Sequence, residues 1–158
     1  MAKRSVSPRI QPGDHIAGRF RIVEQIGSGG FSVVYRAYQE NMHRFVALKV
    51  LKPSISDDES VVERFRREAL FASHLSHPNT ITLFDYGRTD GDLCYIAMEY
   101  LEGTELGKVV RQQGGLSLTR VWSILTQTTQ SLAEAHRLGI IHRDLKPENI
   151  YLVEQGQE

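Results

Sequence analysis

Cysteine is almost absent from this sequence, and neither sign of charge is in excess. Cys94 is the single cysteine among 158 residues, while 19 basic and 19 acidic side chains cancel. A lone thiol cannot form an intramolecular disulfide, so we expect a reducing, cytoplasmic compartment. Because no surplus of Lys and Arg is available to neutralise phosphates, nucleic acid is not an expected partner.

Long apolar runs are also missing. The longest, residues 93–98, falls far short of the ~18 residues that cross a membrane, so no membrane segment is expected in this sequence. Hydrophobic residues make up 41% and charged residues 24%, proportions typical of a globular protein rather than a disordered tail. The basic N-terminal stretch, residues 1–19, lacks the apolar core of a signal peptide, and we expect it to be a flexible arm.

Residue patterns predict strands first and helices later. Apolar and β-branched residues predict five strands, at 20–26, 31–37, 45–51, 80–86 and 93–100. A helix is expected at 59–75, with Asp57 or Asp58 as its N-cap. Beyond residue 100 the pattern predicts helices at 105–113 and 118–138 and short strands at 140–141 and 150–153. The inward stripe of the last helix is expected to contain Val121, Leu125, Thr128, Leu132 and Ala135.

Two charged residues stand out because their neighbours are apolar. Glu68 falls on the apolar stripe of the helix at 59–75, and Lys49 lies among apolar residues in the strand at 45–51. A charge that faces inward is costly unless it is paired. We therefore predict that Lys49 and Glu68 form an ion pair.

Two further segments carry patterns that a packed core does not need. Gly27-Ser28-Gly29-Gly30 joins two predicted strands, whereas a dinucleotide-binding turn leads into a helix and a Walker loop ends in Gly-Lys-Ser/Thr. Such a segment is either a plain hairpin turn or a loop over phosphates, where missing side chains let backbone N–H groups approach closely. The other segment is the polar block HRDLKPEN at 142–149.

Taken together, these motifs resemble those of eukaryotic-like serine/threonine protein kinases, bacterial members in particular. The segment GSGGFSVV at 27–34 is similar to the family's G-x-G-x-x-G-x-V, with Ser32 in place of the third glycine. VALK at 46–49 is similar to V-A-I-K, and the block at 142–149 matches H-R-D-L-x-x-x-N. The resemblance implies an α+β fold of two lobes: a five-stranded antiparallel sheet with one helix at about 20–100, and an incomplete helical lobe at about 101–158.

The resemblance also implies a chemistry and a set of site residues. ATP and Mg²⁺ are the implied cofactors, and Ser or Thr hydroxyls of proteins are the implied substrates. Asp144 is implied as the catalytic base, Lys146 as the residue that steadies the transferring phosphoryl group, and Asn149 as a magnesium ligand. The implied ATP-binding residues belong to the glycine loop, the strands beside it, the lysine–glutamate pair and the hinge: Gly27, Ser28, Gly29, Gly30, Val34, Ala47, Lys49, Glu68, Met98, Glu99 and Leu101.

The sequence stops at Glu158, before the position at which the family carries its second magnesium ligand, the Asp of D-F-G. The resemblance therefore covers only the N-terminal part of a kinase domain. Two hypotheses follow. One is a kinase that transfers the ATP γ-phosphate to Ser or Thr. The other is an inactive kinase fragment that acts as a regulatory module and binds nucleotide or protein; no regulatory partner is identified.

Overall fold

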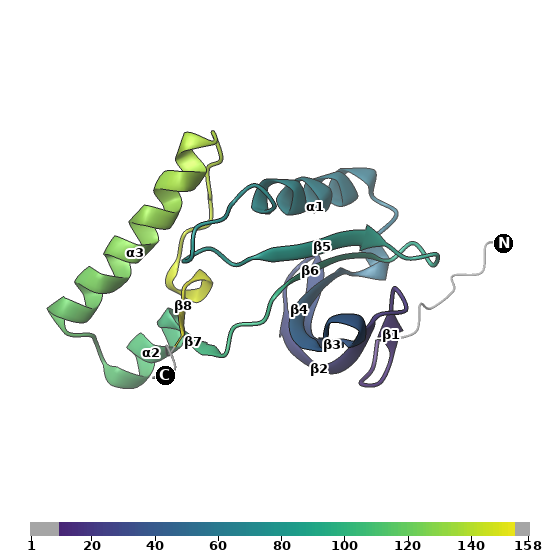
Figure 1. Cartoon of the computed structure of the whole chain (residues 1–158), viewed down its shortest axis with the longest axis horizontal. Coiled ribbons are helices and arrows are strands. Elements are labelled where there is room, and N and C mark those ends of the chain that lie inside the picture. Colours follow the sequence, from purple (N-terminus) through teal and green to yellow (C-terminus); the bar gives the residue numbers. More distant parts are fainter. Residues whose placement is uncertain (1–9, 154–158) are drawn as a thin grey trace. The chain divides into compact units, whose positions relative to one another are not determined.

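The computed structural model describes residues 10–153, which fall into two compact units (Figure 1). The first contains the chain up to Ser73 together with Thr82–Tyr100, and the second contains His74–Ile81 together with the chain from Leu101 onward. The division after Tyr100 coincides with the change from strand to helix patterns in the sequence. None of the helices within the described residues has the length and apolar character that a membrane span requires.

The first unit is built on a curled antiparallel sheet of six strands in the order β1-β2-β3-β4-β6-β5 (Figure 1). The strands are β1 (His15–Ile16), β2 (Phe20–Ser28), β3 (Ser32–Gln39), β4 (Arg44–Leu51), β5 (Leu83–Arg88) and β6 (Cys94–Glu99). Two short 3-10 turns, η1 (Glu40–Met42) and η2 (Pro53–Ile55), flank β4. All five predicted strands are present, and the predicted α+β class is confirmed.

A short strand lies within the segment that the sequence led us to expect as a flexible arm. We expected a flexible arm through residue 19, but β1 pairs with β2, with His15 opposite Arg21 and Ile16 opposite Phe20. Ile16 is 7% exposed, and Ile10 packs against the same core. Burial of these apolar side chains stabilises the pairing. The rest of the expected arm, residues 1–9, lies outside the described residues.

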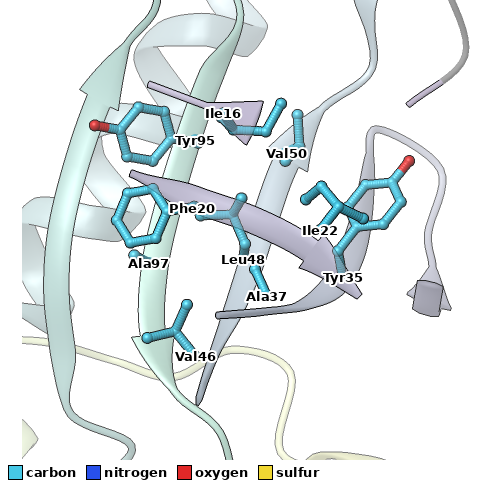
Figure 2. Packing of buried hydrophobic residues seen from close by; sticks show 10 residues of the cluster. All are labelled: Ile16, Phe20, Ile22, Tyr35, Ala37, Val46, Leu48, Val50, Tyr95 and Ala97. Atoms are coloured by element: carbon cyan, nitrogen blue, oxygen red, sulfur yellow. The ribbon is translucent and has the colours of Figure 1, made fainter. Parts of the chain in front are cut away.

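Two apolar clusters form the core of the first unit. Figure 2 shows the first cluster, which packs among the strands of the curled sheet. In it the rings of Phe20 and Tyr95 meet edge to face, and their centroids are 5.6 Å apart. The second cluster lies under the helix α1 (Glu59–Ala72) and contains Leu51, Val61, Phe65, Ala69, Cys94 and Ile96.

Asp58 caps this helix by accepting hydrogen bonds from the N–H groups of the first turn. Burial raises the pKa of the Cys94 thiol, as in a structural cysteine.

The second unit contains two helices and a small two-stranded sheet. Its elements are β7 (Gly103–Glu105), α2 (Leu106–Gln113), α3 (Leu118–Arg137), η3 (Pro147–Asn149) and β8 (Tyr151–Val153), with β7 antiparallel to β8. The predicted strand at 140–141 does not form, and β7 was not predicted. Along α3, Ile124 and Ala135 are buried. Leu125, which we expected to face inward, is 54% exposed, so that prediction was wrong.

The segment His74–Ile81 belongs to the second unit because α3 binds its main chain. The carboxylate of Glu134 accepts hydrogen bonds from the N–H groups of Ser76 and His77 at 3.0–3.2 Å, and from the Ser76 hydroxyl at 2.9 Å. Desolvation raises the pKa of Glu134, but these hydrogen bonds outweigh it and the pKa is lowered. Two more contacts join the same elements, Asn79 to Gln127 and Thr80 to Ser131.

Gly87 is the glycine of the first unit whose replacement we expect to be most costly. It lies opposite Tyr95, and a Cβ at Gly87 would stand 2.5 Å from the Tyr95 hydroxyl oxygen. Tyr95 cannot swing aside freely, because its hydroxyl accepts a hydrogen bond from Arg19 at 2.8 Å and donates one to Asp85 at 3.1 Å. Arg19 and Asp85 also form an ion pair with each other.

We predict that Gly87→Ala destabilises the protein by about 1–3 kcal/mol, the usual cost of overpacking a well-packed site. Urea denaturation followed by far-UV circular dichroism measures the change. The matched control is Gly91→Ala in the turn between β5 and β6, where the added Cβ would meet only Thr89 Oγ1, at 3.9 Å. Equal stability of the two variants would contradict the prediction.

Candidate active site

The glycine segment forms the connection between β2 and β3 in the first unit. Gly27 lies opposite Val34 in the paired strands, and Gly29 N donates to Ser32 O at 2.8 Å. Neither Gly29 nor Gly30 has a positive φ. An added Cβ would meet no protein atom within 4 Å at Gly30 and only Ser32 O, at 3.8 Å, at Gly29. The fold itself therefore does not require glycine at these two positions, which leave open space for close approach of a ligand.

The predicted ion pair between Lys49 and Glu68 is present. Lys49 Nζ on β4 lies 2.5 Å from Glu68 Oε1 on α1. The Lys49 side chain is 23% exposed, whereas the Glu68 side chain is 55% exposed. The apolar stripe had suggested that Glu68 faces inward. Its side chain instead lies at the edge of the buried face of α1. Lys49 remains a cation held in place beside the glycine loop, since it lies opposite Val34 in the sheet.

Three more of the predicted ATP-binding residues lie on neighbouring strands. Ala47 of β4 lies opposite Met98 of β6, so both contribute to the same part of the sheet. Glu99 ends β6; its N–H donates to Thr82 O at 2.8 Å, and its carboxylate accepts from Thr82 N at 3.2 Å. Leu101 is the first residue of the second unit after the division.

The polar block at 142–149 forms a compact cluster of side chains within the second unit. Lys146 Nζ lies 2.9 Å from Asp144 Oδ2. The side-chain amide of Asn149 donates to Asp144 Oδ2 at 3.0 Å and to the Asp144 carbonyl at 2.8 Å. The Asp144 N–H donates to the carbonyl of His142 at 2.8 Å. Arg143 has a φ of +61°, a left-handed conformation that turns the chain sharply before Asp144.

These contacts favour the ionised form of Asp144. The hydrogen bond from Lys146, followed by that from Asn149, lowers the pKa of Asp144 below its usual value. The carboxylate is therefore ionised at neutral pH and can accept a hydrogen bond from a hydroxyl group.

A magnesium ion would find one suitable donor in this cluster. Because the Asn149 amide nitrogen is turned to Asp144, its oxygen is left as an acceptor of the kind Mg²⁺ prefers. Within residues 10–153 no group of three or more His, Cys, Asp or Glu side chains is placed to hold a metal ion. Among the described residues, Asn149 would thus supply one oxygen ligand to a magnesium ion and not a complete set.

The predicted site residues are thus brought together in two sets, one in each unit. The first holds the glycine loop, the Lys49–Glu68 pair and the strands around Ala47 and Met98. The second holds Asp144 with Lys146 and Asn149. Lys52, whose ammonium group contacts the glycine loop, was not predicted from the sequence. Its partners are main-chain carbonyls, which no residue pattern marks.

Comparisons with known proteins agree with these motifs. The family model described as protein kinase domain matches residues 20–157. The chain is 42% identical over 146 residues to the serine/threonine-protein kinase pkn3 of Myxococcus xanthus, covering 92% of this chain and 27% of that protein. It is 40% identical over 144 residues to the serine/threonine-protein kinase PrkC of Bacillus subtilis, covering 91% of this chain and 22% of that protein. The chain thus spans about a quarter of the length of these relatives.

Solved structures show the same fold. The crystal structure of the Mycobacterium tuberculosis PknI kinase domain matches with a TM-score of 0.79 and 31% sequence identity. The match covers 93% of this chain and 59% of that one.

We predict that Lys146→Met raises the pKa of Asp144 toward the usual value of 3.8, because the largest cause of the lowering is removed. An NMR titration of the ¹³C-labelled aspartate carboxyl groups measures this shift. The lowered pKa means that the cluster stabilises the fold above the usual pKa of aspartate and that this contribution is lost as the pH falls through the lowered value. Lys108→Met, at an exposed lysine of α2, removes an equal charge and should leave the Asp144 titration unchanged. An unaltered titration in the Lys146 variant would contradict the assignment.

Proposed function

This chain belongs to the protein kinase domain family, and we propose that the protein transfers the γ-phosphate of ATP to Ser or Thr hydroxyls of protein substrates. The observation that carries the proposal is the ionised Asp144, bonded to Lys146 and Asn149. Transfer to a hydroxyl needs an acceptor for its proton beside a cation that offsets phosphate charge. The relatives pkn3 and PrkC are named serine/threonine-protein kinases, which supports Ser and Thr hydroxyls as the groups that receive the phosphate.

In this proposal the first unit binds the nucleotide. The glycine loop, Gly27 to Gly30, covers the phosphates with backbone N–H groups, and Lys49 neutralises the α- and β-phosphates. Glu68 positions the Lys49 ammonium through their ion pair at 2.5 Å. Val34, Ala47 and Met98 line the adenine site, and the backbone of Glu99 provides hydrogen bonds to it. Leu101, the first residue after the division, is the one member of the predicted ATP-binding set that lies outside the first unit.

The second unit supplies the groups for the transfer itself. The substrate hydroxyl oxygen forms a bond to the γ-phosphorus while the bond from that phosphorus to the β–γ bridging oxygen breaks and ADP leaves. Asp144 orients the hydroxyl and accepts its proton, and Lys146 offsets the charge of the transferring group. Bound Mg²⁺ would neutralise phosphate charge, and Asn149 would hold it through its amide oxygen. We place the reaction in the cytoplasm, where a free thiol such as Cys94 stays reduced.

We predict that Lys49→Met and Asp144→Asn each lower phosphorylation by at least about a hundredfold, because each removes a charge that transfer requires. The assay follows ³²P from labelled ATP into casein with the full-length protein, and far-UV circular dichroism checks the fold of each variant. Lys108→Met is the control and should retain activity. Full activity in both site variants would overturn the proposed function.

We predict that Gly30→Ala leaves the free energy of unfolding unchanged within about 0.5–1 kcal/mol, because the added Cβ would meet no protein atom within 4 Å. The same methyl group should hinder the approach of phosphates and weaken MgATP binding several-fold. Urea denaturation and isothermal titration calorimetry measure the two quantities, with adenosine as a ligand that lacks phosphates. Unchanged MgATP affinity would contradict a phosphate-covering role for the loop.

A further inference from the structure

Lys52, the residue directly after β4, bonds to three successive carbonyl groups: the last two of the glycine loop and that of Phe31, which follows it. Its Nζ donates to Gly29 O at 2.6 Å and to Gly30 O at 3.3 Å, and its backbone N–H donates to Phe31 O at 2.9 Å. Within residues 10–153 no carboxylate forms an ion pair with Lys52. The cation is therefore directed at the loop's main chain. Hydrogen bonds from a charged donor are stronger than neutral ones.

These contacts determine which way the loop's N–H groups face. In a planar trans peptide, the C=O of one residue and the N–H of the next point in opposite directions. The carbonyls of Gly29 and Gly30 are turned toward the Lys52 ammonium. The N–H groups of Gly30 and Phe31 must therefore point away from it.

We propose that Lys52 is a positioning residue that presents the Gly30 and Phe31 N–H groups to the phosphates of ATP. Fixing the peptide planes before the nucleotide arrives reduces the conformational entropy lost on binding. The positive charge stays on the far side of the loop from the phosphates, so Lys52 acts through the main chain and not by touching the nucleotide. This inference rests on the proposed function for its ligand, while the bond between Lys52 and the loop does not.

The test compares Lys52→Met, Lys52→Arg and the control Lys108→Met in the full chain. The first readout is the ¹⁵N order parameter of the Gly30 and Phe31 amides without nucleotide, which reports loop order directly. The second is calorimetric affinity for MgATP and for adenosine. We expect Lys52→Met to lower both order parameters and to weaken MgATP binding about three- to tenfold with adenosine affinity unchanged. Lys52→Arg should retain most of the loop order and most of the MgATP affinity, and Lys108→Met should change neither quantity.

Different failures point to different errors. Weaker MgATP binding in Lys52→Met with unchanged loop order would mean that Lys52 contacts the phosphates directly, which overturns a positioning role. Lower loop order with unchanged MgATP affinity would mean that the contact is structural only, and it also overturns the proposal. An unaltered protein that binds neither ligand would overturn the proposed function and the phosphate part of this inference. The order parameters would still decide whether Lys52 holds the loop.

Discussion

In the first unit the proposed nucleotide site depends on the ion pair between Lys49 and Glu68, which joins β4 to α1. Its free energy is modest, because the Glu68 side chain is 55% exposed and water screens such pairs. Apolar burial of Val61, Phe65 and Ala69 holds α1 on the sheet. The main effect of the pair is therefore to fix the position of the Lys49 ammonium group, and its contribution to the stability of the fold is small. The guanidinium carbon of Arg64, on the same helix, lies 5.9 Å from the centroid of the Phe31 ring, so α1 approaches both Lys49 and the residue that follows the glycine loop.

The second unit reaches its charge arrangement by a different route. Asp144, Lys146 and Asn149 lie within six residues of one another, so short-range turns suffice to bring their side chains together. The left-handed φ of Arg143 and the 3-10 turn η3 (Pro147–Asn149) provide those turns. Little tertiary structure is needed for this cluster beyond the pairing of β8 with β7, which secures its C-terminal end. The first unit, by contrast, joins residues that are 19 positions apart.

Sequence patterns predicted the elements that are long enough to show a period. Helix α1 buries Val61, Phe65 and Ala69 at a spacing of four residues, and β4 and β6 bury nearly continuous apolar runs, so these patterns are visible in the sequence. β1 has two residues and β7 three, too few to show alternation, and both depend on a partner strand. β8 is equally short but was predicted, because IYLV at 150–153 is an apolar run, whereas GTE at 103–105 is not. On α3 the buried face is centred on Ile124 and not on Leu125, an adjacent position that an apolar count alone does not separate. Tertiary contacts decide whether β1 and β7 form and which side of α3 is buried.

A second limit on prediction from the sequence appears at the site. It depends on whether a residue's partner is a side chain or a main-chain group, and not on the length of an element. Lys49 was predicted because it is a charge among apolar residues and its partner is a side chain, whereas Asp144 was predicted from the resemblance of the block at 142–149 to a known motif. Lys52 and Glu134 were missed because their partners are main-chain groups: the carbonyls of Gly29 and Gly30 in one case, the N–H groups of Ser76 and His77 in the other. Every residue has a carbonyl and all but proline an N–H, so such contacts leave no trace in residue type. Residues that shape a loop through its backbone are therefore found only once the fold places them beside it.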